Sequence, residues 1–62
     1  MLNQEIKQIQ NLMHHEEQLA DKAGSPELVA AHEHVAMLYK AELNVLRKKR
    51  AASVAEMLGN LG

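Results

Sequence analysis

Four histidines and several carboxylates are the residues of this 62-residue chain that can bind a metal ion or move a proton. The histidines fall in two pairs, His14-His15 and His32-Xaa-His34, and glutamates stand beside both pairs. Imidazole and carboxylate groups are ligands for zinc and iron. On a helix, however, two ligands share a face only at spacings of three or four residues, and neither pair has that spacing. We therefore expect no metal site and no cofactor.

Other groups that carry out catalysis are missing from the sequence. The chain has no cysteine, no serine placed beside a general base, and no glycine-rich loop that could hold a phosphate. A chain of this length that folds as a helical hairpin also lacks a roomy cleft in which to desolvate a substrate. The sequence predicts a protein that is not an enzyme.

The composition is typical of a small all-α protein. Apolar residues make up 47% of the chain, Tyr39 is the only aromatic residue, and most other residues are strong helix formers. A chain of this size buries only about 60% of the surface that its unfolded form exposes, so it needs additional stabilisation. The chain lacks a secretory signal pattern and an apolar run of about 18 residues, so we expect a cytoplasmic protein that does not enter a membrane.

One turn organises the whole chain. Gly24 can take the left-handed conformation that ends a helix, Ser25 can cap the next helix, and Pro26 fits its first position. We therefore expect a single domain, residues 1–62, that forms an antiparallel helical hairpin. The first helix covers about residues 3–22, the turn covers residues 23–25, and a longer second helix covers about residues 26–58.

Each predicted helix carries a row of residues spaced alternately by three and four, which we call its seam. Such spacing indicates packing against one partner helix. When the two seams pack antiparallel across the turn, residues that face each other have numbers that sum to about 49. The one polar residue in the middle of each seam then falls in the same layer, which predicts a buried polar pair, Glu16 and His32. The seams are Leu2, Ile6, Ile9, Met13, Glu16 and Ala20, and Val29, His32, Ala36, Tyr39, Leu43, Leu46 and Arg50.

The second helix carries another apolar row one position away from its seam, which we call the second stripe. Its apolar members include Leu28, Val35, Leu38 and Val45. A two-helix hairpin cannot bury both rows, and a second copy related by two-fold symmetry supplies the missing surface at low cost. We therefore expect a homodimer, a four-helix bundle, with these four residues in its interface.

The end of the second helix extends past the first helix, and we call this part, from about residue 47, the overhang. Its apolar residues are Val54, Met57, Leu58 and Leu61, and we expect them to bind a partner protein. An alternative is a break near Ala52 followed by a short third helix, because Ser53 and Glu56 have the spacing of a capping box.

Charge is segregated along the chain. Residues 1–46 hold three basic and seven acidic residues, a net charge of −4; Arg47, Lys48, Lys49 and Arg50 add +4, and Glu56 brings the total to −1.

The favoured function is a small non-catalytic interaction module, a regulator, inhibitor or chaperone-like adaptor, that dimerises and captures a larger protein. The alternative is a dimeric RNA- or DNA-binding hairpin whose basic block, residues 47–50, contacts phosphates. A helical scaffold without a natural partner is a third possibility.

Overall fold

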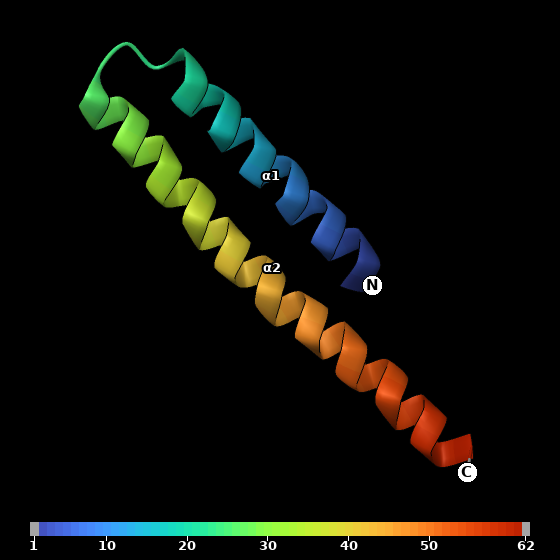
Figure 1. Ribbon diagram of the computed structural model, residues 1–62. Coiled ribbons are helices and arrows are strands. Elements are labelled where there is room, and N and C mark those ends of the chain that lie inside the picture. Colours follow the sequence, from blue (N-terminus) through green and yellow to red (C-terminus); the bar gives the residue numbers. More distant parts are fainter. Residues whose placement is uncertain (1, 62) are drawn as a thin grey trace.

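A computed structural model describes residues 2–61 of the chain, with side chains described for residues 2–59. Two helices, α1 (Leu2–Lys22) and α2 (Pro26–Leu61), run antiparallel and contact each other along the whole of α1 (Figure 1). The described part of the chain contains no strand. The predicted all-α helical hairpin with a longer second helix is confirmed. The molecule is a rod whose Cα atoms span 56 × 15 × 11 Å.

The turn between the helices starts α2 in the expected way. The Ser25 hydroxyl accepts a hydrogen bond from the backbone N–H of Leu28 at 3.2 Å, and the Ser25 carbonyl accepts one from Val29 at 3.0 Å. Ser25 is therefore the N-cap, and Glu27 in the first turn stabilises the positive end of the helix dipole.

The conformation predicted for Gly24 is wrong. None of the described glycines has a positive φ angle, so Gly24 does not adopt the left-handed conformation. The reason lies in the last turn of α1, where the N–H of Ala23 donates to the carbonyl of Ala20 at 3.2 Å. This bond spans three residues instead of four, so it tightens the helix end and reduces the need for a left-handed residue.

The hydrophobic core is the line along which the two seams meet. Ile6 and Ala20 of α1 and Ala36 and Leu43 of α2 are buried, and Leu43, only 1% exposed, is the most enclosed. The other seam positions from Leu2 to Leu46 are half-buried. Four buried side chains are a small core for a free-standing domain, so the hairpin gains little stability from its own packing.

Helix α2 continues without a break through Ala52 and ends at Leu61, three residues later than predicted. Gly59 lies inside the helix, where the missing side chain costs about 1 kcal/mol relative to alanine without preventing the helix. The overhang therefore extends as straight helix beyond the first residue of α1 (Figure 1). Over the described residues, neither helix combines the length and the apolar run needed to span a bilayer.

Candidate interaction surface

Glu16 and His32, which the seam register pairs, lie in contact between the two helices. Nδ1 of His32 is 2.7 Å from Oε2 of Glu16. An ionised carboxylate can only accept, so the imidazole Nδ1–H donates this hydrogen bond. The prediction that this pair is buried is wrong: the pair is half-buried, because 30% of the His32 side chain and 20% of the Glu16 side chain remain exposed. Because only two helices meet at the seam, both side chains are long enough to reach solvent at its edge.

The other histidines lie outside the core. Nδ1 of His14 is 3.2 Å from Oε1 of Glu17 one turn later, and both side chains are more than half exposed. His15 and His34 are also exposed. Among the residues that the structure describes, no three histidine, aspartate or glutamate side chains come close enough to hold a metal ion.

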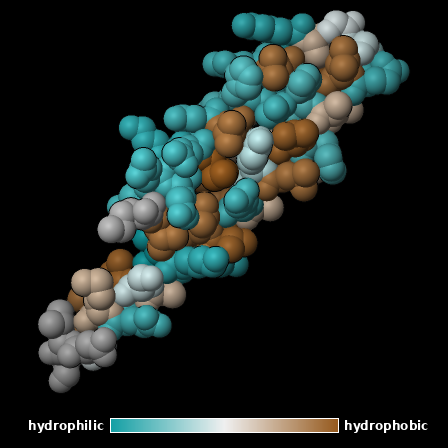
Figure 2. All heavy atoms as spheres, turned by 180° about the vertical axis from the view of Figure 1, so that it is seen from behind, coloured by the Kyte–Doolittle hydropathy of each residue, from teal (hydrophilic) through white to brown (hydrophobic). Residues whose placement is uncertain are grey.

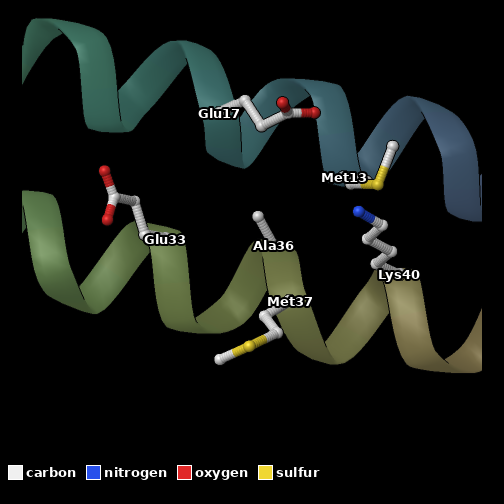
Figure 3. A pocket seen from close by; sticks show the side chains of 6 residues that line it. All are labelled: Met13, Glu17, Glu33, Ala36, Met37 and Lys40. Carbon is white, nitrogen blue, oxygen red and sulfur yellow. The ribbon is translucent and has the colours of Figure 1, made fainter.

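An open groove of about 360 Å³ follows one side of the hairpin. Figure 3 shows Ala36 directed toward α1, Met37 directed away from α1, and the Lys40 side chain reaching toward Met13. Carboxylates from both helices complete its lining, which consists of Met13, Glu17, Glu33, Ala36, Met37 and Lys40. It is a shallow surface channel, and its lining has no serine, cysteine or histidine to act as a nucleophile or a base.

The second stripe lies on the opposite side of α2 from this groove, because residues along a helix turn by about 100° each. Leu28, Leu38 and Val45 are all more than half exposed, and Val35 is half-buried. The same periodicity places Leu12, which is also exposed, and the half-buried Leu19 of α1 on this side of the hairpin. We call the resulting surface the apolar face: Leu12, Leu19, Leu28, Val35, Leu38 and Val45.

The overhang is the most exposed part of α2. Every residue from 51 to 59 is exposed, including Val54 at 51%, Met57 at 69% and Leu58 at 64%. The side chain of Leu61, the fourth predicted contact, lies outside the described side chains. Val54 follows the buried Leu43 by eleven residues, about three helical turns, so the overhang continues the seam of α2 beyond the point where α1 begins.

The basic block separates the hairpin body from the apolar residues of the overhang. Arg47, Lys48, Lys49 and Arg50 are all exposed. The guanidinium Nη1 of Arg50 donates to Oδ1 of Asn3 at 3.2 Å, which ties this end of the block to the start of α1.

The opposite end of the hairpin is acidic. Residues 14–34 around the turn contain five acidic residues and one lysine, a net charge of −4, while the remaining two acids and two lysines of residues 1–46 cancel. The fold therefore places −4 at the turn end and +4 at residues 47–50, and α2 links the two ends as one continuous helix. In Figure 2, apolar atoms reach the surface in separate patches along this charged rod.

Sequence reasoning left several surface residues out of the predicted sites. Leu12 and Leu19 of α1 lie beside the second stripe only because the hairpin brings the two helices together. Glu33, Met37 and Lys40 form the groove with residues of α1, and no sequence motif connects residues that face each other across two helices. The rule that facing residues of the two seams have numbers that sum to about 49 is the signal that could have located both surfaces.

Comparison of the chain with protein-family models, with curated proteins and with solved structures finds no match.

Proposed function

We propose that this protein is a small non-catalytic interaction module that dimerises and captures a larger partner protein through apolar helix surface. The observation that carries the proposal is the overhang, where the seam of α2 continues past the first residue of α1 and α1 no longer covers it. Apolar residues are exposed there in succession, on the side of α2 that α1 covers in the hairpin body.

The exposed apolar residues of the overhang and the cations beside it support a partner of one kind, an amphipathic helix. The surface accepts an amphipathic helix whose apolar residues recur every three or four positions, as α1 does in the hairpin body. The adjacent block of four exposed cations favours a partner helix with acidic residues at the end that lies beside it. Such an interface combines an apolar centre with a charged rim.

The test compares two glutamate substitutions in the overhang. Met57→Glu places a charge on the exposed seam of the overhang. Ala55→Glu places the same charge two residues earlier, on the other side of the helix. With immobilised protein and source-cell lysate, we expect wild type and Ala55→Glu to retain a protein that Met57→Glu loses. Retention should survive nuclease treatment and about 0.5 M salt, because apolar contacts do not depend on released counterions.

Equal retention by Met57→Glu and wild type would contradict the proposal and move the binding surface to the hairpin body. Helical content measured by circular dichroism should be the same for both variants and wild type. That control separates a lost contact from a lost helix.

Nucleic-acid binding is the second candidate function, and the exposed +4 block favours it. A dimer would present this block twice. Titration of wild type with labelled RNA and duplex DNA at two salt concentrations tests the idea. Binding that weakens steeply with salt and is lost on Lys48→Ala would favour this candidate, because each neutralised phosphate releases counterions.

A further inference from the structure

We infer that two copies of this hairpin associate antiparallel through the apolar face, with the basic block of each copy beside the acidic turn end of the other. The inference rests on the dimer proposed above and specifies its arrangement. It follows from three observations: the area that the chain leaves exposed, the position of the apolar face, and the separation of charge along the rod.

The exposed area is the first observation. The chain exposes 4974 Å² of accessible surface. A compact protein of 6.9 kDa exposes only about 4,000 Å². The excess is close to the roughly 800 Å² that each partner buries in a standard stable interface. A second copy therefore supplies the amount of burial that this hairpin lacks.

The position of the apolar face is the second observation. Its residues come from both helices and lie on the side away from the groove, so a second hairpin can pack against it as a layer. When two such layers pack antiparallel around a two-fold axis, α2 lies against the partner's α2. The apolar residues of the second stripe, Leu28, Val35, Leu38 and Val45, are centred between residues 36 and 37, so facing residues of the two α2 helices have numbers that sum to about 73. Leu28 then faces Val45 of the other copy, and Val35 faces Leu38.

The separation of charge is the third observation, and it selects the antiparallel arrangement. Glu27 and Lys49 lie on the same side of α2, 22 residues or about 33 Å apart. In the antiparallel pairing, Lys49 of one copy lies within about one helical turn of Glu27 of the other, at both ends of the dimer. A parallel pairing would place the two −4 ends together and the two +4 ends together, which is unfavourable.

The test of association uses a matched pair of substitutions on adjacent residues. Leu38→Glu charges the apolar face, and Met37→Glu charges the groove side; the two native side chains are 57% and 60% exposed. In sedimentation equilibrium at tens of micromolar, we expect wild type and Met37→Glu at twice the 6.9 kDa chain mass and Leu38→Glu at the monomer mass or unfolded. A helical wild-type monomer would overturn the dimer itself.

The test of orientation uses the absence of cysteine from the chain. Single variants Ala31→Cys and Glu42→Cys are oxidised separately and as a mixture. The antiparallel arrangement brings residue 31 opposite residue 42 of the other copy, while the two residues 31 lie about 16 Å apart, so only the mixture should form a cross-linked dimer in high yield. A wild-type dimer without the mixed disulfide would overturn the orientation and leave the dimer standing. A disulfide formed by either variant alone would also overturn it.

Discussion

Glu16 and His32 are the residues for which spacing alone led to a specific contact. Each interrupts an otherwise apolar seam, and an unpaired polar group at such a position loses hydrogen bonds to water. Their contact at 2.7 Å removes that cost for both residues. A contact of this kind fixes which layers face each other, because a shift of one turn would place each polar group against an apolar one.

A double-mutant cycle tests the contact. We expect Glu16→Leu and His32→Leu to be coupled by about 1 kcal/mol in urea denaturation, a moderate value because both side chains remain partly exposed. The double variant should be as stable as wild type or more stable, since leucine suits both seams. His14 and Glu17 provide the control: their contact is 3.2 Å long and largely exposed, so their coupling should stay below about 0.5 kcal/mol. Zero coupling between positions 16 and 32 would require a different register.

At the scale of the elements, the sequence predicts the helices and their register because both depend on local chemistry and periodicity. Ser25, Pro26 and Glu27 define the start of α2, and the spacing of the seams defines which faces meet. The backbone conformation of Gly24 could not be predicted, because glycine permits both hands of the backbone and a bond from Ala23 decides between them. The partial exposure of the polar pair likewise depends on how narrow the two-helix contact is.

Replacing Gly24 with alanine tests the corrected turn. The position has no positive φ angle, and an added Cβ would meet no atom within 4 Å. We expect Gly24→Ala to raise the free energy of unfolding by about 0.4–1 kcal/mol, because alanine restricts the unfolded chain. Ser25→Ala should lower it by about 1 kcal/mol through the lost cap. Urea denaturation measures both, and a loss of stability in Gly24→Ala would point to a left-handed glycine after all.

At the scale of the whole molecule, this chain is a rod with a small core, an acidic turn end, a basic block at the open end of the hairpin body, and apolar surface on two separate parts. The apolar face lies on the hairpin body, and the exposed apolar residues of the overhang lie beyond it. In the proposed antiparallel dimer, the two overhangs would therefore extend from opposite ends. Met57 of each copy would lie about 60 Å from its counterpart, so one dimer could hold two partner molecules apart without a clash between them.

The antiparallel register also determines the order in which the hairpin closes during folding. The facing residues Ala20 and Val29 are nine positions apart in the chain, whereas Leu2 and Leu46 are 44 positions apart. Closing a short loop costs less entropy than closing a long one, so contacts beside the turn form first and those at the open end form last. Folding and unfolding rates of Val29→Ala and Leu46→Ala, measured by stopped flow, test this order. We expect Val29→Ala mainly to slow folding and Leu46→Ala mainly to speed unfolding, and the reverse pattern would mean that closure begins at the open end.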